Sequence, residues 1–172
     1  MINYQNKLVV LRALEPEDLD FLFDTENNTD LWKYSNRFHP YSKNLLKDYI
    51  ANSDKDIFET HQIKFTISDK HEKAVGFIDL YDFEPLHHRA AVGLMISNVE
   101  RGKGFAKAAL ELIESFAKEQ LQLHQLYAHI AEENQHSIRL FESLGFILSG
   151  KKKDWNFYDG KFHDELIYQK II

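Results

Sequence analysis

The chain of 172 residues contains no cysteine, only three prolines and seven glycines. The absence of cysteine excludes disulfide bridges, thiolate metal sites and a cysteine nucleophile. No segment approaches the ~18 consecutive apolar residues that a membrane-spanning helix requires, and the first residues lack the apolar core of a signal peptide. We therefore expect a cytoplasmic protein that does not act at a membrane, although a chain without cysteine also tolerates an oxidising compartment.

Basic residues are outnumbered by acidic ones, 21 against 27, which gives a formal net charge of −6. This balance argues against nucleic-acid binding, because such binding needs a basic face. The one basic run, at 151–153, is short and predicts a solvated strand end. Among the histidines, His87 and His88 are adjacent on a predicted strand and would point to opposite faces, so we expect no metal site.

The patterns along the chain predict one mixed α/β domain over residues 1–172. Hydrophobic residues make up 44% and charged residues 28% of the sequence, as in globular proteins. Apolar alternation and turn signals predict strands at 7–13, 63–67, 75–80, 92–96, 126–130, 146–157 and 161–171. Helical periodicity and capping residues predict helices from residue 15 and over 43–52, 103–119 and 134–144, with loops and short turns at 27–42.

Residues 101–106 read Arg-Gly-Lys-Gly-Phe-Ala and lie between an apolar strand and the most regular helical pattern. A glycine-rich turn that opens a helix presents converging backbone N–H groups and the positive end of the helix dipole. Gly102 and Gly104 would let the backbone approach an anion that a side chain would block. The turn therefore suggests a phosphate site, and an ordinary strand-to-helix connection is the alternative.

A second pattern begins at Asn134 and runs to the Gly-Phe pair at 145–146. With these two segments the chain resembles the GNAT superfamily of acetyl-CoA-dependent N-acetyltransferases, over nearly its whole length. The first segment is similar to that family's pyrophosphate loop, and Asn134-x-x-Ser137 is similar to its second cofactor segment. Residues 89–93 (Arg-Ala-Ala-Val-Gly) resemble the branch of ribosomal-protein N-terminal acetyltransferases and bacterial spermidine acetyltransferases.

The resemblance implies the GNAT fold, a central mixed and mostly antiparallel sheet flanked by helices. It also implies that acetyl passes from acetyl-CoA to a primary amine by direct attack in a ternary complex. One backbone N–H near Leu94 or Met95 would then polarise the thioester carbonyl. Asn134 would bond the cofactor arm, cap its own helix, or do both. The expected cofactor residues are Leu94, Met95, Ile96, Arg101, Gly102, Lys103, Gly104, Phe105, Ala106, Asn134, Ser137 and Phe141.

Two residues depart from the family pattern at positions that carry catalysis. Phe141 stands where many relatives have the tyrosine that protonates the thiolate, so Ser137 is the nearest hydroxyl for that role. For Ser137 a cofactor hydrogen bond or a helix-cap contact is the alternative. Ala91 stands where relatives often carry a glutamate base, and we expect Asp79, in an apolar run, to contribute instead. The other candidates for the base are Asp82, Glu84, His87 and His88.

The acceptor site is expected in the polar and aromatic stretch at 27–42. Aromatic rings there would line a pocket or pack the first helices onto the sheet. Residues 37–39 (Arg-Phe-His) replace the acidic residues of similar spermidine enzymes, which favours a protein N-terminus over a polyamine as acceptor. A small amine remains the other acceptor, a CoA-binding module without catalysis the other function, and a homodimer is possible. The expected acceptor-binding residues are Asn28, Trp32, Tyr34 and Tyr41.

Overall fold

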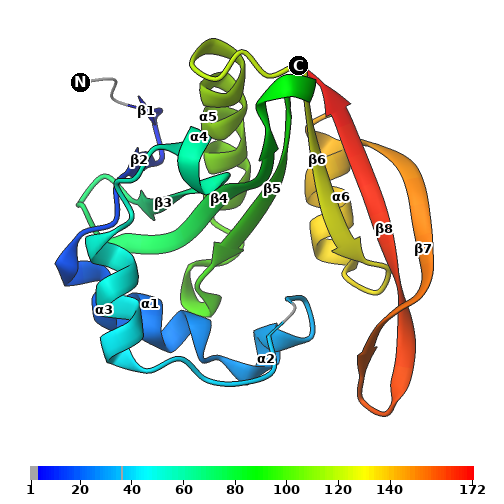
Figure 1. Cartoon of the computed structure of the whole chain (residues 1–172), viewed down its shortest axis with the longest axis horizontal. Helices are drawn as coiled ribbons and strands as arrows, with labels where there is room; N and C mark the ends of the chain where they lie inside the picture. Colours follow the sequence, from blue (N-terminus) through cyan, green and yellow to red (C-terminus); the bar gives the residue numbers. More distant parts are fainter. Residues whose placement is uncertain (1–3, 36) are drawn as a thin grey trace.

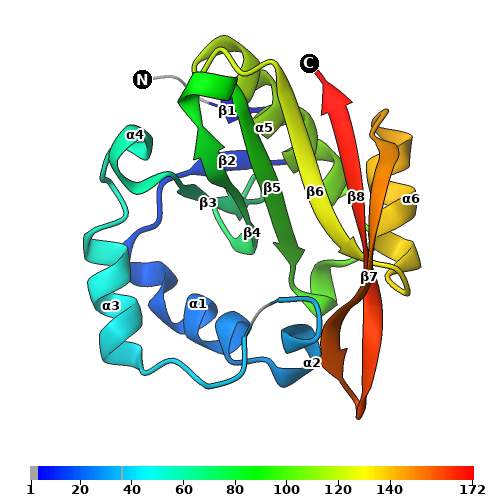
Figure 2. The ribbon, with the colours of Figure 1, turned by 45° about the vertical axis from the view of Figure 1, so that its right-hand side comes forward.

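An open sheet of eight strands forms the centre of the molecule, and helices cover both of its faces (Figures 1 and 2). The computed structural model describes residues 4–35 and 37–172. Across this described part the strand order is β1-β2-β3-β4-β5-β6-β8-β7, and β5 and β6 are the one parallel pair. The strands are β1 (Tyr4–Gln5), β2 (Val10–Arg12), β3 (Ile63–Ser68), β4 (Ala74–Glu84), β5 (Arg89–Ile96), β6 (Gln125–Ala131), β7 (Ile147–Tyr158) and β8 (Lys161–Ile171).

Helices divide between the two faces of the sheet. One face carries α5 and α6 over the larger core, and the other carries α1 and α3 over a smaller core around Leu22, Ile50 and Phe77. α5 packs closely because its inner face presents small or branched residues, of which Ala109 and Ile113 are fully buried. The helices are α1 (Leu19–Glu26), α2 (Thr29–Trp32), α3 (Lys43–Ala51), α4 (Ile57–Thr60), α5 (Phe105–Glu119) and α6 (Gln135–Ser143), with short 3-10 turns at Pro16–Asp18, Pro85–His87 and Asn98–Glu100.

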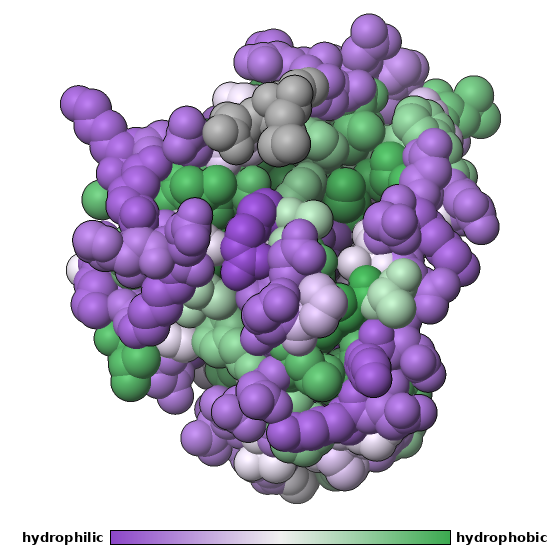
Figure 3. Space-filling model, turned by 90° about the vertical axis from the view of Figure 1, so that its left-hand side faces the viewer, coloured by the Kyte–Doolittle hydropathy of each residue, from purple (hydrophilic) through white to green (hydrophobic). Residues whose placement is uncertain are grey.

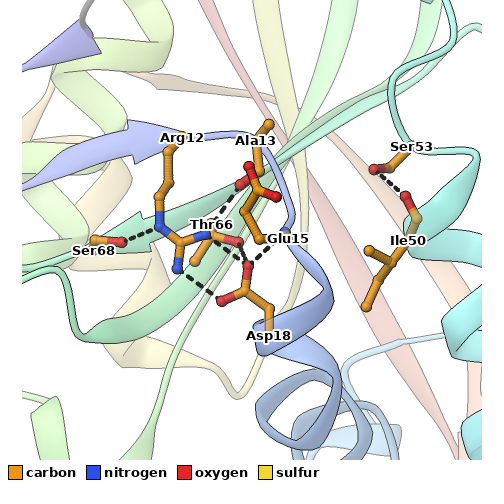
Figure 4. A network of polar contacts seen from close by, with 8 residues as sticks. All are labelled: Arg12, Ala13, Glu15, Asp18, Ile50, Ser53, Thr66 and Ser68. Carbon is orange, nitrogen blue, oxygen red and sulfur yellow. Dashed lines mark hydrogen bonds and ion pairs between the residues drawn. The ribbon is translucent and has the colours of Figure 1, made fainter.

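A buried ion pair fixes the start of α1 against the edge of the sheet (Figure 4). Arg12 of β2 donates both terminal nitrogens to Asp18, each at 2.7 Å, and its Nε donates to the Ser68 hydroxyl at 2.8 Å. Asp18 also accepts hydrogen bonds from Thr66 Oγ1 and from the backbone N–H of Glu15. The carboxylate is only 3% exposed, so these four groups replace the water it loses. The α1 and α3 layer is thereby held at a fixed place over the sheet.

The mixed, mostly antiparallel architecture expected from the sequence is confirmed, with differences at the ends of elements. The first strand is shorter than expected, since only Val10–Arg12 pairs with β3. The short elements β1 and α4 had no clear pattern in the sequence. The expectation that His87 and His88 lie on a strand is wrong. His87 ends the 3-10 turn between β4 and β5, and His88 follows it with a positive φ of 49°.

The surface is mostly polar, with smaller apolar areas. Figure 3 shows the side of the molecule that lies to the left in Figure 1. On this side, hydrophilic residues (purple) surround smaller hydrophobic areas (green). Leu45 of α3 and Phe58 of α4 are about half exposed, at 50% and 56%. In the described part of the chain, no helix combines the length and the apolar character needed to cross a bilayer.

Candidate active site

The two parallel strands at the centre of the sheet separate part-way along their length. β5 pairs with β4 along nearly its whole length, from Arg89 to Ile96. It pairs with β6 only over 89–91, opposite 125–127, and then the two strands diverge (Figures 1 and 2). From Val92 to Ile96 the β6-facing edge of β5 therefore has no strand partner among the described residues. Such an edge offers backbone groups to an extended ligand, as the amides of a pantetheine arm would require.

The glycine-rich turn lies at the open end of this separation. Gly102 and Gly104 have φ angles of 78° and 84°, in the left-handed region that favours glycine. Counting from Gly102, the first backbone N–H that donates to a backbone carbonyl is that of Ala108, which donates to Gly104 O at 3.1 Å. Within the described part of the chain, the N–H groups of residues 102–107 have no such acceptor. The turn thus fits a pyrophosphate, which would accept from these groups at the positive end of α5.

Two lysine side chains are fixed beside the turn by a buried glutamate. Glu100 accepts from Lys73 and from Lys103, each at 2.6 Å, and is itself only 6% exposed. These hydrogen bonds lower the pKa of the Glu100 carboxyl, so it stays ionised. Two ammonium groups around one carboxylate leave a net positive charge next to the turn. Lys73 and Glu100 were not predicted from the sequence, because their pairing joins the residue before β4 to the 3-10 turn at Asn98–Glu100, across 27 positions.

The start of α6 combines a helix cap with a partly exposed hydroxyl. Asn134 accepts from the backbone N–H of Ser137 at 3.2 Å, so its predicted capping role is confirmed. Ser137 is half-buried on the first turn of the helix. Phe141, expected among the cofactor residues, is instead 5% exposed and packs edge-to-face on Phe146 at 5.0 Å between ring centroids. Its ring therefore contributes to the core, and it has no hydroxyl to offer a thiolate.

Asp79 lies on the sheet face that carries α1 and α3, next to the unpaired part of β5. Its Cα partner on β3 is Lys64 and its partner on β5 is Gly93. Burial raises the pKa of the Asp79 carboxyl, and the nearby Lys64 ammonium partly opposes that rise. The Lys64 ammonium lies 3.2 Å from the carboxylate of Glu26, and the two carboxylates raise its pKa in spite of burial. Asp79 is therefore a polar group at the place where β5 and β6 separate.

The other predicted base candidates lie farther from the open part of β5. Asp82 and Glu84 are exposed on the bulged end of β4. His87 and His88 belong to the turn before β5, at the end where β5 is still paired with β6, and His88 Nδ1 lies 2.9 Å from Gln122 O. Of the five candidates, the structure places Asp79 alone beside Gly93.

A cavity of about 660 Å³ lies beside the part of β6 that no longer pairs with β5. It lies between α2 with the loop after it and the hairpin of β7 and β8, which Figure 2 shows facing one another. His129 and Ala131 of β6 and Glu165 of β8 form the part nearest the strand separation. Aromatic side chains supply much of the remaining lining: Trp32, Tyr34, Phe38, Trp155, Phe157 and Tyr158.

Trp32 and Tyr34 line this cavity as predicted, but the other two expected acceptor residues do not. Asn28 accepts from the backbone N–H of Asp30 at 3.0 Å and caps α2. Tyr41 packs against the smaller core, and its backbone N–H and carbonyl are both bonded to the side chain of Asn27. Both residues therefore shape the loop and do not line the cavity.

Of the two cations expected at residues 37–39, one lines the cavity, and it is paired with a carboxylate. Arg37 lines the cavity, but it lies 2.9 Å from the Glu26 carboxylate and its guanidinium stacks 3.8 Å from the Tyr41 ring. His39 is exposed beside the loop and is not part of the cavity lining. Glu26, which also pairs with Lys64, compensates part of the charge of Arg37, so the loop repels a cationic acceptor less than the sequence suggested.

Comparison with known proteins agrees with a site that binds an extended, phosphate-bearing cofactor. The sequence profile of the acetyltransferase (GNAT) domain matches residues 9–147. The chain is a member of the GNAT family. It is 28% identical over 159 residues to the spermidine N(1)-acetyltransferase of Vibrio cholerae, covering 92% of this chain and 90% of that one. It is 30% identical over 159 residues to the Escherichia coli K12 enzyme of that name, covering 92% and 83%.

Among solved structures, the fold matches that of spermidine N-acetyltransferase from Vibrio cholerae in complex with CoA and spermine. The TM-score is 0.87, at 26% identity and with 96% of each chain covered. As a GNAT acetyltransferase, the protein is an enzyme that uses acetyl-CoA to acetylate amines. The alternative of a CoA-binding module without catalysis is not favoured. The described residues contain no group of three or more His, Asp or Glu side chains placed to hold a metal ion.

Proposed function

We propose that this acetyltransferase modifies a small aliphatic amine that carries a second positive charge, as polyamines do. The observation that carries the proposal is the aromatic cavity, which is lined by His129 and Ala131 on the part of β6 that no longer pairs with β5. An amine in the cavity would meet the thioester from the face of the sheet opposite α5 and α6. A protein N-terminus, which residues 37–39 favoured from sequence alone, becomes the competing acceptor in the test.

The charge of the cavity lining supports a cationic acceptor. Three acidic side chains line it, those of Asp30, Asp159 and Glu165, of which Glu165 is paired with Lys152. Of the two basic residues in the lining, Lys33 remains, because Arg37 is paired with Glu26. Aromatic faces add a further attraction for an ammonium group, worth about 0.5–2 kcal/mol for each well-placed ring. The names of the similar spermidine enzymes point to the same class of acceptor.

The donor side of the reaction is assigned to the separated strand and the two helix N-termini. Backbone groups at Leu94, Met95 and Ile96 would bond the pantetheine arm, and one of these N–H groups would polarise the thioester carbonyl. The turn Arg101, Gly102, Lys103, Gly104, Phe105 and Ala106 would hold the pyrophosphate. Ser137 would donate a proton or a hydrogen bond to the leaving thiolate.

Asp79 is proposed to hold the incoming amine at the carbonyl carbon. Its carboxylate lies beside Gly93 on the unpaired part of β5, on the acceptor face of the sheet. A carboxylate at that position attracts an ammonium ion and orients the nitrogen toward the strand edge. The proton that the ammonium must lose needs a separate acceptor.

Kinetics of variants in the cavity test the acceptor class. The double variant Asp30→Asn/Asp159→Asn removes two negative charges and keeps side-chain size, and asparagine tolerates the positive φ of residue 159 (51°). We expect the KM for spermidine to rise about tenfold and that for propylamine to change less than twofold. Lys33→Met is the matched control and should leave the KM for spermidine unchanged or lower it. An equal loss for both amines would contradict a second-charge site.

We also propose the extent of the domain, its compartment and its association with other copies. The matched profile ends at residue 147, but β8 lies between β6 and β7, so the last two strands complete the same sheet. We infer one domain over residues 1–172, acting in the cytoplasm. We also propose that copies of the chain associate, since a related structure from Vibrio cholerae, with a TM-score of 0.80, is described as dodecameric.

A further inference from the structure

His129 is the first residue of β6 to point to the acceptor face after β6 has left β5. The last pair of the two strands is Ala91 with Tyr127, and side chains alternate along a strand, so His129 shares the face of Tyr127. Ala91 is paired with Tyr81 on β4, which shares its face with Asp79. His129 and Asp79 therefore lie on the same face of the sheet, on either side of the separation. His129 is also part of the cavity lining.

One nitrogen of the His129 ring is already engaged by charged neighbours. Nδ1 lies 3.4 Å from Glu165 Oε1 and 3.4 Å from Lys152 Nζ. Lys152 Nζ is closer to the carboxylate, at 3.0 Å, and Asn156 also donates to Glu165 at 3.1 Å. The Lys152 ammonium can only donate to Nδ1 and the Glu165 carboxylate can only accept from it, so these two neighbours favour opposite tautomers. In the tautomer that carries the proton on Nδ1, facing Glu165, Nε2 has a free lone pair. No hydrogen bond of Nε2 is found among the described residues.

We propose that His129 is the proton acceptor that converts the bound ammonium group into the nucleophilic amine. In this step one N–H bond of the ammonium breaks and an Nε2–H bond forms, so the neutral imidazole becomes an imidazolium ion. The imidazolium passes its proton to solvent through the open cavity. As the C–N bond then forms and the C–S bond breaks, a second proton leaves the nitrogen and goes to the thiolate. The balance is one amide, one thiol and one released proton.

The surroundings of His129 keep its ring neutral near pH 7. Burial and the Lys152 ammonium lower its pKa, and the Glu165 carboxylate partly opposes them. The side chain is 23% exposed, enough to reach the cavity while most of the ring is shielded. The titratable groups that face it are Tyr127 on β6, Lys152 on β7, Glu165 on β8 and Asp82 on β4.

The assignment accounts for the missing glutamate at Ala91. Ala91 lies directly beside Tyr127 across the paired part of the strands, so a base on β6 two residues farther along reaches the same acceptor face. The sequence did not single out His129, because it stands alone in an alternating strand. The signal that reveals it is the register of β6 against β8 and β5.

The test compares His129→Gln with His124→Gln, an exposed histidine at the far end of the sheet, next to the start of β6. kcat/KM for spermidine is measured by thiol release between pH 5 and 9, and NMR measures the ring pKa of His129. We expect His129→Gln to lose about a hundredfold in kcat/KM and to lose the acid limb, with partial rescue by added imidazole. His124→Gln should behave as the wild type.

A second variant separates a proton acceptor from a structural histidine. Lys152→Met removes the positive neighbour and should raise the NMR pKa of His129 and the midpoint of the acid limb together. The proposal is overturned if His129→Gln keeps kcat/KM within twofold, or if the two midpoints move independently. The inference rests on the proposed amine acetylation. Absence of turnover by the wild type with spermidine and with peptides overturns both, whereas turnover that ignores His129 overturns this inference alone.

Discussion

The Oδ1 atom of Asp79 lies 2.8 Å from the point where a side chain on Gly93 would begin. Only a hydrogen at that position leaves room for the carboxyl group over β5. The two residues are cross-strand partners, so the glycine on one strand sets the place of the carboxylate on the next. This pair connects the backbone that would hold the thioester with the face that would receive the amine.

Gly93→Ala should therefore displace the Asp79 carboxylate and lower kcat/KM for the amine about tenfold, with little change in CoA affinity. The φ of Gly93 does not lie in the left-handed region, so alanine itself fits the strand. The double variant Gly93→Ala/Asp79→Ala relieves the clash. Its thermal midpoint should match that of Asp79→Ala within about 2 °C. A normal kcat/KM in Gly93→Ala would show that the place of the carboxylate is unimportant.

A substitution in the glycine-rich turn at 101–106 should affect the binding of CoA. Gly104→Glu adds a negative charge and a side chain at a position with a φ of 84°, and we expect CoA affinity to fall at least a hundredfold. Gly160→Ala is the matched control, because Gly160 also has a positive φ of 74° and open space around it, in the turn between β7 and β8. It should lose about 1 kcal/mol of stability and bind CoA normally in calorimetry. Unchanged CoA affinity in a folded Gly104→Glu protein would refute the phosphate assignment.

Ser137→Ala distinguishes a catalytic hydroxyl from a binding one. Asn134 accepts from the backbone N–H of Ser137, so the cap survives the loss of the hydroxyl. We expect kcat to fall about tenfold while the dissociation constant of CoA changes less than twofold, since the hydroxyl would act on the developing thiolate. Single-turnover thiol release and calorimetry measure the two quantities. Equal losses in both would leave Ser137 as a cofactor-binding residue only.

The Arg12–Asp18 pair predicts how stability depends on pH. Burial alone would raise the pKa of Asp18, but the hydrogen bonds from Arg12, the Glu15 N–H and Thr66 outweigh it and lower that pKa. A lowered folded pKa means stability that is present above the unfolded value of about 3.9 and is lost as the pH falls through the folded value. Asp18→Asn should cost about 2 kcal/mol at pH 7, since Arg12 is 29% exposed and partly screened.

Chemical denaturation at several pH values measures the free energy of unfolding of the wild type and of Asp18→Asn. The difference between the two free energies should narrow as the pH drops below about 4. A constant gap down to pH 2 would mean that the asparagine lowers stability through packing and not through charge.

The helices and strands, and the turn and cap geometry of the two segments expected to bind the cofactor, were predictable because their signals are local. Turn glycines with positive φ, the Asn134 cap and the Asp-Gly hairpin at 159–160 each depend on neighbours within a few residues. The same holds for the alternation that marks β3 and β6. The mixed and mostly antiparallel character of the sheet followed from the family resemblance, and the strand order came only from the structure.

The acceptor side was predictable only in part, because its geometry depends on residues far apart in the chain. The sequence does not reveal a partner for Arg37, because only the fold brings its guanidinium to the Glu26 carboxylate. Tyr41 belongs to an aromatic stretch, yet its neighbours turn it toward the smaller core. The position of His129 on the acceptor face is visible only from the strand register, and its partners Lys152 and Glu165 lie 23 and 36 positions away in the chain.

The acceptor class is decided by thiol release from acetyl-CoA when the wild-type protein is given spermidine, propylamine or a short peptide with a free N-terminus. We expect a kcat/KM for spermidine at least tenfold above that for propylamine, and thiol release at the background rate with the peptide. Acetylation of the peptide in preference to spermidine would contradict the assignment of the cavity to a small polycationic amine.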